Sequence, residues 1–393
     1  MRVTKDAERQ IRSGHPWVFD GALREPVEGR AGDLAVVFDH DRRFLAIGLF
    51  DPRSPIRVRV LHHGKPCTID EKWLSETIAT ALEVRRPLLD RGDTNAFRLV
   101  HGENDGLGGL VVDVYDNSAV VKIYSEAWTP WLPYIVDAVV AVGVALPGGI
   151  SRVVLRQART VADNHRDGEV LYGPEPEGPV EFTENGLRFR TDLQRGHKTG
   201  HFLDQRDNRQ MIRELSDGRR VLDVFACTGG FSVHAAAGGA TGVTSVDISG
   251  PALSLASDNM ALNAEYTGDS THRTVVGDAF DVLEDFAEQG RRFDLVVLDP
   301  PAFAQRKNQV GRAIRAYERL AALGSRIVEP GGLLFQSSCS SRITEADLIE
   351  AVHTGLQRSG RDATEVRRTA QPVDHPVGFE QGRYLKAVLL RVS

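Results

Sequence analysis

Two short motifs in this 393-residue chain carry side chains that could do chemistry. They are Asp299-Pro300-Pro301-Ala302-Phe303 and, further along, Ser338-Cys339-Ser340. Each follows an apolar run typical of a buried strand, Phe293 to Leu298 for the first and Leu333 to Gln336 for the second. In an open parallel sheet, ligands collect at the carboxyl ends of the strands. A carboxylate, a rigid Pro-Pro turn and a thiol at that edge predict an active site that modifies a nucleic-acid base.

Cys339 has two interpretations. A free cysteine is most often a small buried hydrophobe, but a thiol that ends a strand beside Asp-Pro-Pro is placed to act as a nucleophile. The other cysteines, Cys67 in a linker-like stretch and Cys227 near a glycine-rich loop, lie far from it in sequence. The three form neither a metal-ligand spacing nor a disulfide framework, which fits a reducing cytoplasm. Taken alone, the residues leave both interpretations of Cys339 open.

The glycine-rich loop follows another strand-like run. Residues 220–225 read as a buried strand that leads into Ala226-Cys227-Thr228-Gly229-Gly230-Phe231 and then a helix through Ala237. The glycines allow a sharp turn and a close approach to a ligand. The spacing is not the Gly-x-Gly-x-x-Gly of dinucleotide-binding proteins. Taken alone, the loop is either a cofactor loop or a plain strand-to-helix turn.

Acidic residues follow the next two strands. Asp247 ends one run, where it could accept both hydroxyls of a ribose, and Asp278 follows the next, where it could accept from an adenine amine. A lone acidic residue after a strand is often a helix N-cap. Three successive strand ends that carry an aspartate, followed by Asp299, favour an adenosine cofactor instead. Because no pyrophosphate cradle accompanies them, we expect S-adenosylmethionine rather than a nicotinamide dinucleotide.

The net charge of −6 hides two basic segments. Residues 186–220 contain nine Lys or Arg residues and five Asp or Glu residues. Residues 303–326 contain six Lys or Arg residues and one Glu residue. The second segment directly follows Asp-Pro-Pro, where a phosphate backbone would pass if a base entered the site. It is either an RNA-binding surface or a solvated helix face.

Composition and pattern divide the chain into three parts. Charged residues are 26% and hydrophobic ones 41%, as in ordinary globular proteins. No apolar run approaches the roughly 18 residues that span a bilayer, and the N-terminus has no apolar signal core, so we expect a cytoplasmic protein without membrane contact. The length suggests two or three domains. We place them at residues 1–70, 71–185 and 186–393.

The first part reads as a small β-barrel and the second as mixed α+β. Strand-like runs in the first part are Leu34 to Phe38, Phe44 to Phe50 and Ile56 to Leu61. In the second, a helical pattern from about Ile69 leads into Pro87, a helix is expected from Pro130 to Val142, and Asp163 to Pro179 is expected to be an exposed loop. The last part alternates strands and helices. This predicts an α/β fold with a Rossmann-like doubly wound sheet.

Several motifs together carry a family resemblance: Gly196-His197-Lys198-Thr199-Gly200, Phe202-Leu203-Asp204-Gln205-Arg206, the loop 225–231, Val246-Asp247, Asp299-Pro300-Pro301 and Cys339-Ser340. The chain resembles the bacterial large-subunit ribosomal RNA methyltransferase I family, which makes 5-methylcytosine in 23S rRNA with S-adenosylmethionine. The segment 15–19 resembles the start of its N-terminal PUA RNA-binding domain, 102–110 its central domain, and Asp374-His375-Pro376 with Tyr384-Leu385-Lys386 its C-terminus. The resemblance covers essentially the whole chain.

The resemblance implies a mechanism and partners. Cys339 would add to carbon 6 of cytosine, and Asp299 would bond ring nitrogen 3 and the exocyclic amine as the adduct forms. Phe303 would stack on the base or pack beneath the turn. Ribosomal RNA, of the 23S kind, is the implied partner, and a homodimer is compatible with the family. The target base would have to be unstacked first.

The resemblance also assigns a cofactor site and no metal. The residues expected to bind S-adenosylmethionine are Phe202, Asp204, Gln205, Arg206, Asp223, Phe225, Thr228, Gly229, Gly230, Asp247, Ile248, Asp278, Ala279, Asp299 and Pro300. His197, Lys198 and Arg206 either hold the cofactor carboxylate or RNA phosphates, or brace the domain junction.

Two departures from the family leave the target nucleotide open. Ala302 stands where Lys is common, and Ser341 stands where Gly is common. Two other functions are also open. Enzymes that methylate exocyclic amines or guanine nitrogen 7 use a similar Asp-Pro-Pro motif and need no thiol. A ribosome assembly factor that binds RNA without catalysis would keep the fold and lose the cofactor.

Overall fold

The computed structural model describes residues 1–393 except 160, 162–164, 195–200 and 305. The chain forms two compact units. The first comprises Met1–Thr183, Thr191–Leu203 and Val373–Gly382, and the second comprises Glu184–Arg190, Asp204–Pro372 and Arg383–Ser393. A hairpin of β10 (Val180–Glu184) and β11 (Leu187–Thr191) carries the chain between them. Each unit is described by itself below.

The first unit begins with a four-stranded antiparallel sheet in the order β1-β4-β3-β2. Its strands are β1 (Trp17–Phe19), β2 (Leu34–Phe38), β3 (Phe44–Phe50) and β4 (Ile56–His63). Helix α1 (Lys5–Arg12) adds Ala7 and Ile11 to the core between them. The three predicted strand runs are present here, and β4 extends two residues beyond its expected end.

A five-stranded sheet in the order β5-β6-β7-β8-β9 forms the rest of the first unit. Its strands are β5 (Ala96–His101), β6 (Leu110–Tyr115), β7 (Ser118–Ile123), β8 (Arg152–Gln157) and β9 (Val170–Tyr172). Helices α2 (Glu71–Leu89) and α3 (Leu132–Gly143) pack against each other, and both contribute to its core. The 3₁₀ turns η2 (Gly102–Asp105) and η3 (Glu126–Trp131) lie between strands and before α3.

Two local expectations for this region need correction. Helix α2 continues through Pro87 to Leu89, because a proline so close to the C-terminus removes only one helical hydrogen bond. The segment expected to be an exposed loop contains β9, which pairs antiparallel with β8. A three-residue edge strand is too short to give a periodic sequence pattern, which is why it was missed.

The second unit is a seven-stranded sheet in the order β14-β13-β12-β15-β16-β18-β17. The strands are β12 (Arg220–Val224), β13 (Gly242–Asp247), β14 (Thr271–Val276), β15 (Phe293–Leu298), β16 (Val328–Ser338), β17 (Ala363–Ala370) and β18 (Lys386–Val392). The first five run parallel, and β18 pairs antiparallel with both β16 and β17. This confirms the predicted Rossmann-like α/β fold.

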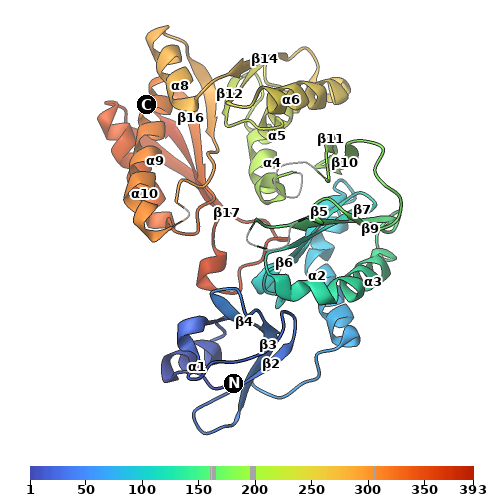
Figure 1. Cartoon of the computed structure of the whole chain (residues 1–393). Coiled ribbons are helices and arrows are strands. Elements are labelled where there is room, and N and C mark those ends of the chain that lie inside the picture. Colours follow the sequence, from blue (N-terminus) through green and yellow to red (C-terminus); the bar gives the residue numbers. More distant parts are fainter. Residues whose placement is uncertain (160, 162–164, 195–200, 305) are drawn as a thin grey trace. The chain divides into compact units, whose positions relative to one another are not determined.

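Helices cover both faces of this sheet (Figure 1). One group comprises α4 (Arg206–Glu214), α5 (Gly230–Ala237), α6 (Gly250–Leu262) and the short α7 (Ala264–Thr267). The other comprises α8 (Ala279–Glu288), α9 (Val310–Arg326) and α10 (Glu345–Arg358), with α9 packed on both of its neighbours. The remaining 3₁₀ turns are η1 (Asp20–Ala22), η4 (Leu203–Gln205), η5 (Lys307–Gln309) and η6 (Glu380–Gly382). Among the described residues, no helix is long and apolar enough to cross a membrane.

Candidate active site

Asp299 and Cys339 follow neighbouring parallel strands. Leu298, the last residue of β15, is in register with Gln336 of β16, so Asp299 stands level with Ser337. The hydroxyl of Ser337 donates to Asp299 Oδ1, and the amide of Gln205 donates to the same oxygen at 2.6 Å. The predicted neighbourhood of these two strand ends is therefore present, and the carboxylate is held from two sides.

The carboxyl of Asp299 holds its proton more tightly than an ordinary aspartate does. Burial raises its pKa to about 6, and the charge of Asp204 acts in the same direction. The hydrogen bonds from Ser337 and Gln205 oppose this rise without cancelling it. A carboxyl poised near neutrality can exchange a proton with a bound base.

Cys339 lies beside the Asp-Pro-Pro turn. Its Sγ is 3.8 Å from the carbonyl oxygen of Pro300, and its side chain is partly exposed. The next residue fixes the two loops to each other, because the Ser340 hydroxyl donates to the Ala304 carbonyl at 2.7 Å. The thiol is thus accessible on a segment that is anchored to the loop carrying the carboxylate.

Phe303 packs beneath this turn. Its ring centroid lies 5.1 Å from that of the buried Tyr317 on α9 and 6.4 Å from that of Phe280 on α8. Of the two roles expected from sequence, the structure supports packing.

The glycine-rich loop after β12 has an unusual backbone. Phe225 and Cys227 have φ angles of 67° and 49° although neither is glycine, and Gly229 has a φ of 78°. A Cβ at Gly229 would lie 2.8 Å from the Cβ of Ala256 on α6. Strain of this kind is typical of functional loops. Thr228 and Gly230 complete the turn into α5, so the loop's predicted residues lie together.

Asp247 ties this loop to the end of β13. Its Oδ2 accepts from the backbone N–H of Cys227 at 2.9 Å, and its Oδ1 accepts from that of Ser249 at 2.8 Å. Each oxygen keeps a further lone pair, as two ribose hydroxyls would require. Burial, with the charge of Asp247, raises the pKa of the Cys227 thiol to about 11. Cys227 is therefore protonated at neutral pH, which suits a lining residue rather than a nucleophile.

The residues after β14 and beside Asp247 are more exposed. Asp278 is the N-cap of α8, with its Oδ1 accepting from the N–H of Phe280 at 2.9 Å. Ala279 is buried as the first residue of that helix, whereas Ile248 is 73% exposed. The capping role that the sequence left open for Asp278 is present, and its second oxygen stays available for a ligand.

Asp223 lies under the loop, fully buried on β12. Its Oδ2 accepts from the Ser232 hydroxyl at 2.6 Å, and Oδ1 has no hydrogen-bond partner among the described residues. Burial raises its pKa to about 7. We expect it to brace the loop as a neutral acid below that pH.

The segment that precedes α4 contributes buried polar residues to the second unit. Asp204 accepts from the Tyr384 hydroxyl at 2.8 Å, and Gln205 contacts Asp299 as above. The side chain of Arg206 is fully buried. Phe202 belongs to the first unit and is partly buried there. The predicted His197 and Lys198 lie outside the described residues.

Several residues at these strand ends were not predicted as site residues. They are Ser337, Ser340, Tyr384, Lys386 and Asn208, whose amide donates to Gln205 at 2.6 Å. A usable signal was present in two places. Polar residues end the apolar run of β16, and a lysine opens the apolar run of β18.

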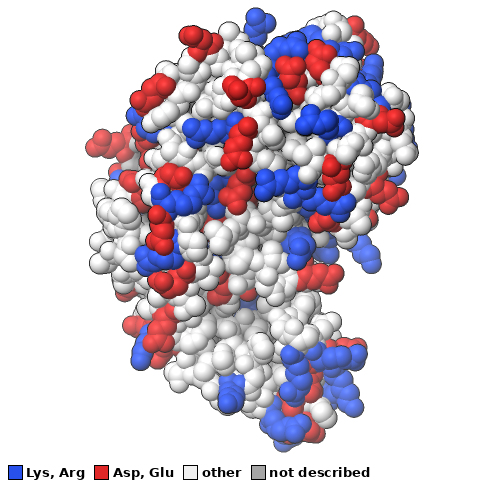
Figure 2. Space-filling model, turned by 180° about the vertical axis from the view of Figure 1, so that it is seen from behind, with Lys and Arg blue, Asp and Glu red and all other residues white. Residues whose placement is uncertain are grey.

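The basic segment after Asp-Pro-Pro lies on α9 and the loop before it. Its six basic side chains are all exposed, namely Arg306, Lys307, Arg312, Arg315, Arg319 and Arg326. Arg319 pairs with Glu284 at 3.4 Å and lies over the Phe280 ring. On the face of the molecule shown in Figure 2, acidic and basic residues are interspersed. Both interpretations of the segment stay open.

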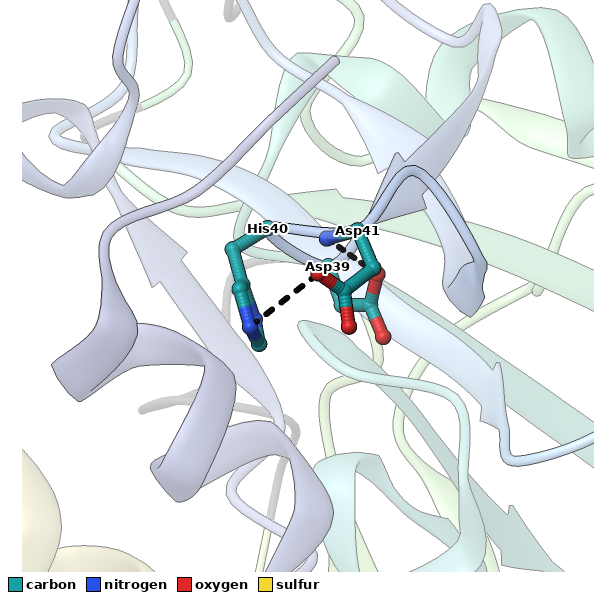
Figure 3. A group of neighbouring side chains, drawn as sticks. All are labelled: Asp39, His40 and Asp41. Carbon is teal, nitrogen blue, oxygen red and sulfur yellow. Dashed lines mark hydrogen bonds and ion pairs between the residues drawn. The ribbon is translucent and has the colours of Figure 1, made fainter.

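A second group of acidic and imidazole side chains lies in the first unit. Ligand atoms of Asp39, His40 and Asp41 lie within 4.8 Å of one another (Figure 3). The Asp39 carboxylate, however, accepts from Arg12 at 2.9 Å and from Arg43 at 3.1 Å. It also accepts from backbone N–H groups of the turn between β2 and β3. These bonds explain the group as the brace of a hairpin turn.

Comparisons with known proteins agree with this architecture. Residues 97–391 match the S-adenosylmethionine-dependent methyltransferase family, and residues 1–63 match a PUA-like domain. The chain is 44% identical to a ribosomal RNA large subunit methyltransferase of Deinococcus radiodurans over 100% of this chain and 97% of the relative. It is 36% identical to the ribosomal RNA large subunit methyltransferase I of Alteromonas mediterranea, over 98% of this chain and 97% of the relative.

Solved structures share the fold. SMU.776, described as a methyltransferase and solved in complex with SAH, superposes with a TM-score of 0.85 at 23% identity and covers 100% of this chain and 99% of its own. At that identity, the likeness speaks for the fold alone. The matched family and the full-length relatives carry the assignment. The chain belongs to the ribosomal RNA large-subunit methyltransferase I family of S-adenosylmethionine-dependent methyltransferases.

Proposed function

We propose that this enzyme makes 5-methylcytosine in the 23S rRNA of the large subunit, through a covalent adduct between Cys339 and carbon 6 of the base. The observation that carries the proposal is the partly exposed thiol of Cys339, 3.8 Å from the Pro300 carbonyl, beside a carboxyl held at the end of the neighbouring strand. The names of the full-length relatives support ribosomal RNA as the substrate class. With this function, we expect the protein to act in the cytoplasm.

S-adenosylmethionine is the cofactor of this family, and the strand ends fit it. When bound, it supplies a methyl group on a positively charged sulfur. The close approach of Gly229 to α6 leaves no room for a side chain in the loop. Asp247 retains lone pairs for ribose hydroxyls beside that loop. We assign the loop and Asp247 to the adenosine half of the cofactor, with Asp278 nearest the adenine.

The roles of the two catalytic residues follow from electron flow. Carbon 5 of cytosine is a poor nucleophile until the Cys339 thiolate adds to carbon 6 and the carbon 5–carbon 6 π electrons move into the ring. Asp299 gives its proton to nitrogen 3 in that step, so that the adduct carries no ring charge. Carbon 5 would then attack the methyl carbon that the cofactor supplies, and the methyl–sulfur bond would break with its electrons left on sulfur. Loss of the carbon 5 proton to a base restores the double bond and expels the thiolate, and nitrogen 3 returns its proton to Asp299.

The raised pKa of Asp299 suits this role. A carboxyl with an ordinary pKa would be a charged acceptor at neutral pH, whereas Asp299, at about 6, still holds a proton in a useful fraction of molecules. Its hydrogen bonds from Gln205 and Ser337 fix the carboxyl in place. Both bonds are made to Oδ1, so Oδ2 is the oxygen that we expect to face the base.

Trapping the adduct tests the proposal. Ribosomal RNA that contains 5-fluorocytosine is incubated with the enzyme and S-adenosylmethionine, because fluorine at carbon 5 blocks the final elimination. Mass spectrometry is expected to find RNA bound to the peptide that contains Cys339. The variant Cys339→Ala should form no adduct.

Cys227→Ala is the matched control, since it removes a thiol from the cofactor loop and leaves the nucleophile in place. It is expected to form the adduct. Methylation of ordinary RNA that survives Cys339→Ala, with no adduct, would contradict the thiol mechanism and indicate a nitrogen target. A protein that neither binds S-adenosylmethionine nor methylates RNA would be a non-catalytic assembly factor.

A further inference from the structure

Lys386 is a buried lysine with no role in the mechanism above. It opens strand β18 and stands opposite Ser338 in the antiparallel pair with β16. Only 3% of the residue is exposed. An ammonium group is expensive to bury and is seldom placed in a sheet without a partner or a function. The sequence around it, Leu385 and then Ala387 to Leu390, is otherwise apolar.

The ammonium group of Lys386 reaches the segment that carries the nucleophile. Its Nζ donates to the carbonyl of Ser340, the residue after Cys339, and to the carbonyl of Tyr384 at 3.0 Å. Ser340 is itself fixed to Ala304 through its hydroxyl. Lys386 therefore holds the turn after Cys339 from β18, which flanks β16 on the edge opposite β15.

Charged and titratable groups around Lys386 and Cys339 come from each neighbouring element. Lys386 interacts electrostatically with Cys339 and with Asp347 on α10. Cys339 and Asp299, which follows β15, both interact electrostatically with Tyr317 of α9. The Tyr317 hydroxyl is hydrogen-bonded to the Ser338 hydroxyl at 2.8 Å. Tyr317 has a pKa raised by burial, so it is neutral. Among Lys386, Asp347, Tyr317 and Asp299, Lys386 is the one that carries a positive charge.

We propose that Lys386 is a positioning residue for the reaction, which holds the turn after β16 and stabilises the thiolate of Cys339 by its charge. The inference rests on the proposed function of Cys339. An opposite charge nearby favours the ionised form of a thiol, and the thiolate is the nucleophile. Burial lowers the pKa of Lys386 to about 8, so the charge is present at neutral pH and is lost as the pH rises through that value.

Alkylation of Cys339 by iodoacetamide tests this without RNA or cofactor. The rate at Cys339 is followed against pH by peptide mass spectrometry, which separates it from Cys67 and Cys227. Lys386→Gln keeps a donor for the Ser340 carbonyl and removes the charge, and Lys386→Arg keeps both. We expect the midpoint of the profile to move up by about one pH unit or more in Lys386→Gln. Lys386→Arg should stay close to the wild type.

Lys72→Gln, on the exposed face of α2, is the control for loss of a lysine charge and should leave the profile unchanged. Binding of S-adenosylmethionine checks that Lys386→Gln is folded. If this variant does not bind the cofactor, Lys386→Met replaces it in the alkylation test. A neutral variant that matches the wild-type profile would overturn the inference and leave Lys386 a structural residue. Because alkylation needs no RNA, an absent 5-fluorocytosine adduct in the wild type would refute the proposed function separately.

Discussion

At the scale of single residues, the site depends on where protons reside at neutral pH. Asp299 has a pKa raised to about 6 because it is buried near Asp204, and Cys227 has one raised to about 11. Lys386 has one lowered to about 8. Each shift is mainly the effect of burial on a charged form. The result is a carboxyl that can donate, a loop thiol that is inert and an ammonium that remains charged.

Asp299→Asn is expected to slow adduct formation on 5-fluorocytosine RNA by about 100-fold or more, because an amide cannot transfer a proton to nitrogen 3. The protonated form of Asp299 is populated below about pH 6 and lost above it. The wild-type rate constant should therefore fall as pH rises through that region, relative to Asp299→Asn. Single-turnover gel assays across pH measure both. Equal rates for the two proteins would remove Asp299 from the chemistry.

Sequence reasoning at this scale succeeded where a side chain sits at a strand end. The positions of Asp299 and Cys339 after β15 and β16 follow from two apolar runs and the neighbourhood of these strands. The contacts of Tyr384 with Asp204 and of Lys386 with Ser340 could not be predicted, because they join residues far apart in the chain. The sequence left open whether Asp278 is a helix N-cap or a cofactor ligand, and the structure shows that it caps α8.

At the scale of elements, the cofactor loop is a strained turn braced by a close helix contact. Left-handed backbone at Phe225, Cys227 and Gly229 turns the chain from β12 into α5. The N–H of Cys227 is fixed by Asp247 at the end of the next strand. The loop is thereby shaped before a ligand arrives.

Gly229→Ala is expected to weaken S-adenosylmethionine binding by about tenfold or more and to lower stability by about 1–3 kcal/mol, since it adds a side chain at a strained φ and against Ala256. Calorimetric titration and thermal unfolding measure the two effects. Gly218→Ala, also at positive φ but with open space around its Cβ, is the control. It should cost stability and leave cofactor affinity intact.

Helix α4 is held to strand β10 by a buried ion pair. Arg209 donates twice to Glu184, at 2.6 Å for each bond, and both side chains are almost fully buried. Arg209→Leu leaves the Glu184 charge buried beside the neutral His234. Removing one partner of such a pair costs about 3–5 kcal/mol. Chemical unfolding measures the loss.

Arg9→Leu provides the comparison, because Arg9 pairs with Asp6 on the exposed face of α1. An exposed pair contributes about 0–1 kcal/mol. Similar losses for the two variants would show that the buried pair is no more important than a surface one.

The elements predicted from sequence were those with a clear apolar pattern. Strands β2, β3 and β15 have their expected bounds because alternation or a continuous apolar run marks them. The short edge strand β9 and the passage of α2 through Pro87 have no such mark. The insertion of β18 between β16 and β17 depends on pairing between distant segments.

At the scale of the whole molecule, buried acids and histidines act in opposite directions on stability. Asp223 and Asp299 have raised pKa values, so the folded state holds protons that the unfolded chain releases. Stability from these two groups is present below about pH 4 and is lost as pH rises toward 6 and 7. His101 and His234 have pKa values lowered by burial, and their contribution is lost instead as pH falls.

Asp223→Asn isolates one of these contributions. Its free energy of unfolding should rise relative to the wild type as the pH is raised from about 5 to about 8, because the variant has no proton to release. Urea unfolding at both pH values gives the difference. A constant difference between the two proteins would show that Asp223 keeps an ordinary pKa in the folded state.

The chain's division into three parts at 1–70, 71–185 and 186–393 stays a prediction. The segment Val373–Gly382 belongs to the first unit, although residues on both sides of it belong to the second. There, the Asp374 carboxylate accepts from the N–H of Arg98 at 3.0 Å and its carbonyl accepts from Arg85 at 3.0 Å. Sequence pattern could not reveal such a return, because it is made by hydrogen bonds rather than by periodicity.

The sheet order also has a consequence for biosynthesis. Strand β17 precedes β18 in the chain but lies outside it, with β18 between β17 and β16. A nascent chain emerges N-terminal end first, so both β16 and β17 stand as unpaired edges until β18 arrives. Open edges of this kind invite wrong pairings. Strand β18, whose Lys386 donates to the Ser340 carbonyl, is therefore also the strand whose pairing covers the open edges of both β16 and β17.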